Sequence, residues 1–346
     1  MANFHAHTGK FLESPKKVAR SALLLDSLYN YFGYNIFSIS DYQSINIREK
    51  KYNWYIPVYE HGYMYYKNHQ LVLNAKKVSW LDFPFPQTLS NEQFVIDRLK
   101  KDRSSIISIV HPMYRKAYSF KDIKYLSNYE ILEIANHDRL FLPYYDTILS
   151  EGHPIFLIAD DDAHEMDNIE DVCSSFNLIN TDLVRDSVLK ALRTGRSVGV
   201  KFNISSFKTN QEKKAALLNL PRITSIAFKN DSIAVRLSKD VKTIQFIGQH
   251  GSPKRSLENC STGSYLFSAS DTYIRTEIEG YDGTIYLLNP FFRYNGTSMP
   301  EYIPERNILK TWVCRSSGIV LLLFSILLWK RKLLAQWFFK RKLQDN

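Results

Sequence analysis

The segment "NFHAHT" (Asn3 to Thr8) decides how the rest of the chain is interpreted. The chain has only nine histidines, and two of them, His5 and His7, flank a single alanine here. In an extended strand, residues i and i+2 point to the same side, so both imidazoles can be aimed at one point. This arrangement offers two nitrogen ligands to a metal ion, although a strand end whose histidines only make hydrogen bonds fits the segment equally well. Residues further along the chain have to decide between the two interpretations.

The first half of the chain alternates short apolar runs with amphipathic helices. Buried strands are predicted over 35–40, 55–60, 70–75, 105–111, 129–136 and 154–161. Helices are predicted over 14–33, which opens on Ser-Pro and closes on glycine, and over 90–102. Strands that alternate with helices indicate an α/β protein with a parallel sheet, either open or closed into a barrel.

Residue types that bind metal ions recur at the ends of these strands. In α/β sheets, functional groups gather where the strands end. Beyond His5 and His7, the strand ends supply Asp41, Glu60, His61, His69, His111, Glu133, Asn136, His137, Asp160, Asp161, Asp162 and His164. Because six strands in succession deliver such residues, we interpret "NFHAHT" as the first two ligands of a metal centre.

The order and spacing of these residues resemble the PHP superfamily, the polymerase and histidinol phosphatase phosphoesterases. The resemblance covers Asn3 to about Cys173 and includes an opening HxHT, an "HP" at 111–112 and a closing D-x-H at 162–164. It implies a distorted β/α barrel of about seven strands with up to three divalent metals. The region that follows resembles the β appendage of PHP proteins that carry a carboxy-terminal β domain.

The resemblance also implies a set of metal ligands. One metal would be held by His5, His7, Glu60 and Asp162. A second would be held by Glu60 as a bridging ligand, together with His69 and His111. Tyr42 stands where the family has a histidine for a third metal, and only Glu13 could replace a missing early ligand. We therefore expect two divalent ions, with Mn, Zn or Fe all suited to these ligands, and His164 touching the substrate or the bridging water.

The expected chemistry follows from the charge of such a centre. Two cations a few ångströms apart would hold a metal-bridging hydroxide at neutral pH and neutralise the charge that grows on an ester. The prediction is a metal-dependent hydrolase whose small-molecule substrate is a phosphate ester. Two alternatives stay open: hydrolysis of a non-phosphate ester, carbamate or amide, and a non-catalytic metal-binding or interaction module, which Tyr42 favours.

Five residues are predicted to act on the substrate: His164, Asp41, Arg115, His61 and His137. Arg115, in "HPMYR", is a candidate phosphate clamp, although an ordinary exposed arginine is the simpler interpretation. His61 and His137 neighbour predicted ligands. Each is interpreted either as an acid that faces the substrate or as a hydrogen-bond partner of a ligand.

After residue 183 the pattern changes to short β segments. A helix over 183–197 is followed by strands with hairpins around "KND" (229–231), "GSPK" (251–254) and "GYDG" (280–283). The predicted organisation is a PHP-like domain over 1–183, a small all-β domain over 184–300, a linker over 301–311, a hydrophobic helix over 312–329 and a basic tail over 330–346.

The composition is that of a globular protein: 45% of the 346 residues are hydrophobic and 14% are aromatic. Three widely spaced cysteines argue against a thiolate zinc site and against a fold based on disulfides. The formal net charge is +10, and the last 17 residues carry six Lys/Arg against one Asp. This concentration of charge points to an anionic membrane surface, and no nucleic-acid partner is expected.

The segment Ser316 to Trp329 has 14 residues without a charge. As a helix it would extend over roughly 21 Å, against roughly 30 Å for the hydrocarbon core of a bilayer. Flanking Trp and Lys/Arg residues favour a membrane anchor, transmembrane or interfacial, that contacts lipid, with a buried C-terminal helix as the alternative. The chain does not open on a signal peptide. We therefore expect a membrane-anchored protein of uncertain side, extracytoplasmic if the natural protein has an upstream signal.

Overall fold

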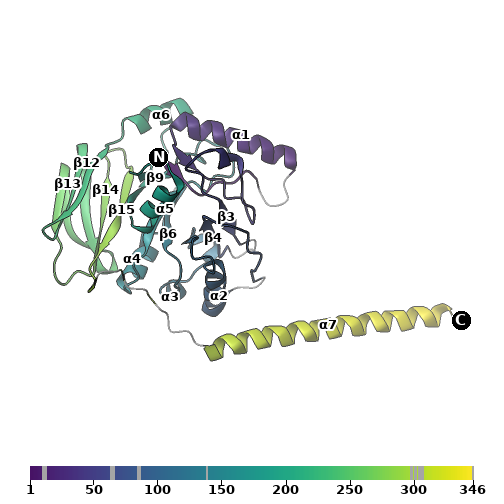
Figure 1. Ribbon diagram of the computed structural model, residues 1–346. Helices are drawn as coiled ribbons and strands as arrows, with labels where there is room; N and C mark the ends of the chain where they lie inside the picture. The colour runs from purple at the N-terminus through teal and green to yellow at the C-terminus, as the bar shows by residue number, and fades with distance from the viewer. Residues whose placement is uncertain are drawn as a thin grey trace.

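The computed structural model shows a mixed α/β fold built on two sheets (Figure 1). It describes residues 1–9, 14–62, 67–83, 87–137, 139–296 and 308–344, together with Met299 and Tyr302. Within these residues, the α-helices are α1 (Pro15–Phe32), α2 (Leu89–Leu99), α3 (Phe120–Ile123), α4 (Leu142–Ser150), α5 (Arg185–Arg193), α6 (Asn210–Leu218) and α7 (Ile308–Gln344).

The predicted first helix is confirmed, and its ends follow from local chemistry. The Ser14 side chain accepts a hydrogen bond from the backbone N–H of Lys17 at the start of α1, where Pro15 occupies the first turn. Gly33 ends the helix with φ at +84°, a left-handed conformation that glycine adopts without steric cost. Tyr29, on the inner face of α1, is fully buried.

The smaller sheet contains all but one of the apolar runs predicted in the first half of the chain. Its strands are β3 (Val58–His61), β4 (Gln70–Leu73), β5 (Ile106–Ile109), β6 (Ile131–Asn136), β7 (Arg139–Leu140) and β8 (Phe156–Asp160). Every residue of β3, β4, β5, β6 and β8 is buried, which explains why their apolar residues occur in runs rather than in strict alternation with exposed polar ones. The architecture includes a curled half-barrel, which agrees with the predicted barrel only at this coarse level.

The prediction of a parallel sheet holds for only part of this region. β6 pairs in parallel with β5 and β8, but β4 is antiparallel to both β3 and β5. The physical reason lies in the connection from β3 to β4, which spans only residues 62–69. A parallel crossover needs about a dozen residues or more, so the chain has to turn back on itself here.

The larger sheet joins the two halves of the chain. Its strands are β1 (Ala2–Asn3), β2 (Ile36–Phe37), β9 (Ser175–Ile179), β10 (Ser197–Lys201), β11 (Ile223–Lys229), β12 (Ser232–Gly248), β13 (Ser252–Leu266), β14 (Tyr273–Glu279) and β15 (Ile285–Phe292). The three predicted hairpins are present as the pairs β11/β12, β12/β13 and β14/β15. Because β10 pairs with both β9 and β15, the sheet continues across the boundary predicted at residue 183.

The hydrophobic segment 312–329 lies inside α7, which extends away from the two sheets in Figure 1. The Arg315 guanidinium lies over the ring of Phe94 in α2, 4.0 Å from the ring centroid. In the part of the chain that the structure describes, no helix is both long and apolar enough to cross a membrane. The transmembrane helix predicted here is therefore not supported.

Candidate metal centre

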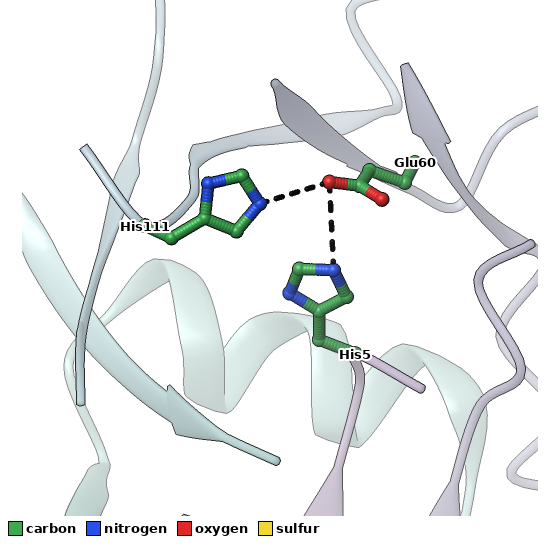
Figure 2. Close-up of side chains that lie close together, drawn as sticks. All are labelled: His5, Glu60 and His111. Atoms are coloured by element: carbon green, nitrogen blue, oxygen red, sulfur yellow. Dashed lines mark hydrogen bonds and ion pairs between the residues drawn. The ribbon is translucent and has the colours of Figure 1, made fainter. Parts of the chain in front are cut away.

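The structure brings together all six side chains that the sequence predicts as metal ligands. Each comes from a strand or from a residue close to the end of one: His5 and His7 follow β1, Glu60 lies in β3, His69 precedes β4, His111 follows β5 and Asp162 follows β8. Figure 2 shows three of them, with His5 and His111 both directed at the Glu60 carboxylate. We call these six residues the Glu60 cluster. Its members are buried, except that the Asp162 side chain is 15% exposed.

Backbone hydrogen bonds hold the first and last ligand segments side by side. The Asp162 N–H donates to the His5 carbonyl over 2.8 Å, and the His7 N–H donates to the Ala163 carbonyl over 2.8 Å. This ladder keeps His5 to His7 extended, so the two imidazoles point to the same side, with ring centroids 5.2 Å apart. Phe4 and Ala6 alternate with them and are fully buried in the core.

Two neighbouring aspartates, Asp160 and Asp161, orient the loop that carries Asp162. Asp161 accepts hydrogen bonds from three successive backbone N–H groups, those of Cys173, Ser174 and Ser175, over 2.8–3.0 Å. Asp160 accepts the Phe4 N–H over 2.8 Å. These bonds fix the loop between β8 and β9 against the first strand and leave the Asp162 carboxylate directed into the cluster.

Glu60 occupies the centre of the cluster, and its two oxygens face different histidines. Oε1 lies 3.0 Å from His111 Nε2 and 3.6 Å from His5 Nε2, and it also contacts His69 Nδ1. Oε2 lies 3.1 Å from His7 Nε2. Asp162 adds a second carboxylate, with Oδ1 at 3.1 Å from His5 Nε2 and 3.3 Å from His7 Nε2. A carboxylate in this position could coordinate a cation through each of its two oxygens.

The donor atoms fit divalent cations. Two groups, one of His5, Glu60 and His111 and one of His5, His7 and Asp162, each place their ligand atoms within 4.8 Å of one another. Nitrogen and oxygen ligands about 2.0–2.2 Å from an ion lie roughly 3–3.5 Å apart, which matches the separations around Glu60.

Unsatisfied buried atoms point to the same conclusion. Among the described residues, several buried atoms of the cluster have no hydrogen-bond partner: His5 Nε2, His7 Nε2, His69 Nε2, Glu60 Oε2 and Asp162 Oδ1. Buried polar atoms without partners are costly and need an explanation. Cations coordinated by these atoms would satisfy them.

Burial and neighbouring carboxylates shift the pKa values of the cluster histidines in opposite directions. Burial alone lowers the pKa of an imidazole, but Asp162, Glu133 and Glu60 outweigh it and hold the pKa of His5 well above 6.5. Asp162 and Glu60 likewise raise the pKa of His7 to about 9. At His69 burial prevails and lowers the pKa to about 4, despite Glu60. A cation that binds near neutral pH must therefore displace protons from the imidazoles of His5 and His7.

Glu133 and Asn136 support the cluster from β6, in a role that the sequence analysis did not assign. Glu133 Oε1 lies 2.8 Å from His5 Nδ1, so His5 can donate this hydrogen and direct Nε2 into the cluster. Glu133 Oε2 accepts the His111 N–H over 2.8 Å and the Asn136 amide over 2.9 Å. The Glu-x-x-Asn spacing, with both residues at the end of a buried strand, was the available signal.

His164 and Asp41 lie beside the cluster, in different roles. The His164 ring packs against His7 at 4.4 Å between centroids, and its side chain is 23% exposed. Asp41 accepts hydrogen bonds from the Thr8 backbone over 2.8 Å and from the Thr8 hydroxyl. His164 is thus placed to meet a ligand, whereas Asp41 anchors the segment that carries His7.

The other three predicted residues do not enter the cluster. His61 is fully buried, and its ring nitrogens lie 2.8 Å from the Gln70 side chain and 2.8 Å from the Leu81 carbonyl, which leaves no nitrogen for a substrate. Because neighbouring residues of a strand point to opposite sides, His61 faces away from Glu60. His137 lies at the periphery, with Nδ1 4.0 Å from Asp171. The exposed Arg115 lies with its guanidinium 5.7 Å from the centre of the Tyr114 ring.

Comparisons with known proteins add little to this picture. No family model matches the chain, and no curated protein matches it. Among solved structures, the chain is similar to PsfC from Pseudomonas syringae PB-5123, with 12% identity and a TM-score of 0.39 over 63% of this chain and 94% of that one. A similarity this weak carries no argument about fold or function, so the PHP assignment stays an interpretation of the sequence.

Proposed function

We propose that the chain is a metal-dependent hydrolase of phosphate esters that works with two divalent ions. The observation that carries the proposal is the position of Glu60, whose two oxygens face different imidazoles in a buried cluster of six ligand residues. Two ions bound there would activate water for attack and neutralise charge on the ester. His/carboxylate ligands suit Mn, Zn or Fe.

The residues around the two ions would have different roles. Glu60 would bridge, with His5, His7 and Asp162 on one side and His69 and His111 on the other. Glu133 would orient His5 through the hydrogen bond to Nδ1. His164, half-buried beside His7, would face the substrate. Phosphate esters are favoured as substrates because their negative charge otherwise repels an attacking hydroxide.

Metal reconstitution of the full chain tests this proposal. The purified protein would be stripped with a chelator, reloaded with Mn, Zn or Fe, and assayed for bound ions and for hydrolysis of 4-nitrophenyl phosphate and its bis ester. We expect about two ions per chain, as in binuclear hydrolases, and turnover that depends on them. Absence of bound metal, or a loaded protein that cleaves neither ester, would refute the proposal. A third, fully occupied ion ligated by His164 would refute the two-ion part alone.

A further inference from the structure

A lysine and two polar groups border the Glu60 cluster on one side. The Tyr42 hydroxyl lies 3.2 Å from Lys67 Nζ and 3.3 Å from His164 Nε2. Lys67 also lies over the Tyr42 ring, with Nζ 4.9 Å from the centroid. We call Lys67, Tyr42 and His164 the Lys67 triad. Lys67 was not among the site residues predicted from the sequence.

The triad is fixed directly against the ligands. The Tyr42 ring stacks on His7, with centroids 4.4 Å apart and planes 20° apart, and it meets the His69 ring edge-on at 5.5 Å. The Lys67 carbonyl accepts the His69 N–H over 2.8 Å. The ammonium group of Lys67 therefore contacts a phenol ring that itself contacts two ligand histidines.

The triad also lies where the cluster is open. His5, His7 and Glu60 have no exposed surface, whereas the side chains of Asp162 and His164 are 15% and 23% exposed. Lys67 and Tyr42 are partly buried in the same way. A substrate that reaches the metal ligands from the Asp162 and His164 side thus meets these three residues.

The charge of Lys67 is not matched by the groups around it. Among the described residues, its ammonium pairs with the neutral Tyr42 hydroxyl, and no carboxylate lies within ion-pairing distance of it. A partly desolvated cation that has only a neutral partner attracts an anion, and an ammonium donates strong, charge-assisted hydrogen bonds to phosphate oxygens.

We propose that the Lys67 triad binds a non-bridging phosphate oxygen and makes the enzyme selective for phosphomonoesters. This inference rests on the proposed two-ion hydrolase. A monoester dianion has three non-bridging oxygens, so one is left over when two ions each take one. A diester has only two, and its single charge gives Lys67 less to recognise.

The test compares Lys67→Gln with Lys76→Gln in the metal-loaded full chain. Lys76 is an exposed lysine that pairs with Asp102 beyond the far end of β4, so its variant controls for the loss of one positive charge. Bound ions, the affinity for inorganic phosphate by calorimetry, and kcat/KM for 4-nitrophenyl phosphate and its bis ester would be measured. Lys67→Arg tests whether the charge alone restores function.

We expect Lys67→Gln to keep its metal, to bind phosphate roughly tenfold or more weakly, and to lose roughly tenfold or more in kcat/KM for the monoester, with the diester little changed. Lys67→Arg should recover most of the loss, and Lys76→Gln should match the unmodified protein. Unchanged phosphate affinity, or equal losses on both esters, would overturn the triad proposal. If neither ester is cleaved by any form but Lys67→Gln still weakens phosphate binding, the hydrolase proposal fails and the phosphate site stands.

Discussion

Two buried groups of charged side chains, the Glu60 cluster and the Asp146–Arg275 pair, differ in how their polar atoms are satisfied. Arg275 of β14 donates from Nε and Nη2 to the two oxygens of Asp146 in α4 over 2.7 and 2.8 Å, and from Nη1 to Glu277 over 3.0 Å. In the Glu60 cluster, by contrast, carboxylate oxygens and imidazole nitrogens face one another and several have no hydrogen-bond partner among the described residues.

This difference separates a buried ion pair that stabilises the fold from a buried group of side chains that can bind metal. The hydrogen bonds between Asp146 and Arg275 join α4 to β14 of the larger sheet and satisfy both side chains without a further ligand. In the Glu60 cluster, several buried imidazole nitrogens and carboxylate oxygens without a hydrogen-bond partner are directed at one region, as expected of groups that can coordinate a cation. Changes in the two groups should therefore have different consequences.

Removal of the Glu60 carboxylate should have the largest effect on function. In Glu60→Ala both ions lose a ligand, so we expect loss of bound metal together with a fall in activity on the order of 10³-fold or more. Metal analysis and ester hydrolysis on the same sample provide the measurement. Glu92→Ala is the matched control, because Glu92 is also buried but lies outside the cluster. Full metal content in Glu60→Ala would show that Glu60 does not bridge.

Disruption of the Asp146–Arg275 pair should cost stability and leave the metal in place. Removal of one partner leaves an uncompensated buried charge, so Arg275→Met should lower the free energy of unfolding by about 3–5 kcal/mol. The double variant Asp146→Leu/Arg275→Met should recover much of this loss. Urea unfolding measures both. The assignment of this pair to stability alone would be wrong if Arg275→Met lowered the free energy of unfolding by less than about 1 kcal/mol, or if it lost bound metal.

The sequence carried more information about the strands and ligands than about their connections. Buried strands and residues such as His5, Glu60 and Asp162 could be predicted, because apolar runs and ligand residue types are local signals. The direction of β4 could not be read from periodicity, since a reversed strand is as apolar as a parallel one. The role of Glu133 depends on a contact across 128 positions, and that of Lys67 on the course of the segment that precedes β4.

Glu133 combines features of both groups. Both of its oxygens make hydrogen bonds, and one of these bonds is to His5, a member of the Glu60 cluster. Glu133→Gln should disturb the hydrogen bond to His5 Nδ1 and with it the orientation of Nε2, which we expect to weaken metal affinity by about 10–100-fold. A competition titration with a chelating dye measures the affinity. Glu130→Gln, three residues earlier in the chain and paired with Lys100, is the matched control. Equal affinities in the two variants would reduce Glu133 to a purely structural residue.

Glu49 provides the smallest and most discriminating test, because it is buried and incompletely bonded but lies outside the cluster. It belongs to a short 3-10 turn (Arg48–Lys51), is 3% exposed, and its Oε1 has no hydrogen-bond partner among the described residues. Burial raises the pKa of Glu49 from 4.5 to about 7. If a missing partner alone marked a functional group, Glu49 would affect metal binding. We expect instead an effect on stability only.

The sign of that effect follows from the raised pKa of Glu49. Folding favours the protonated carboxyl, so its contribution to stability is fully present below pH 4.5 and is lost as the pH rises through about 7. Glu49→Gln cannot ionise, so relative to the unmodified protein it should gain about 2 kcal/mol between pH 4.5 and pH 8. Urea unfolding of the metal-free protein at both pH values measures this gain, with exposed Glu151→Gln as the control for loss of a carboxylate. A gain at low pH instead, or a change in bound metal after reconstitution, would contradict the assignment of Glu49 to the scaffold.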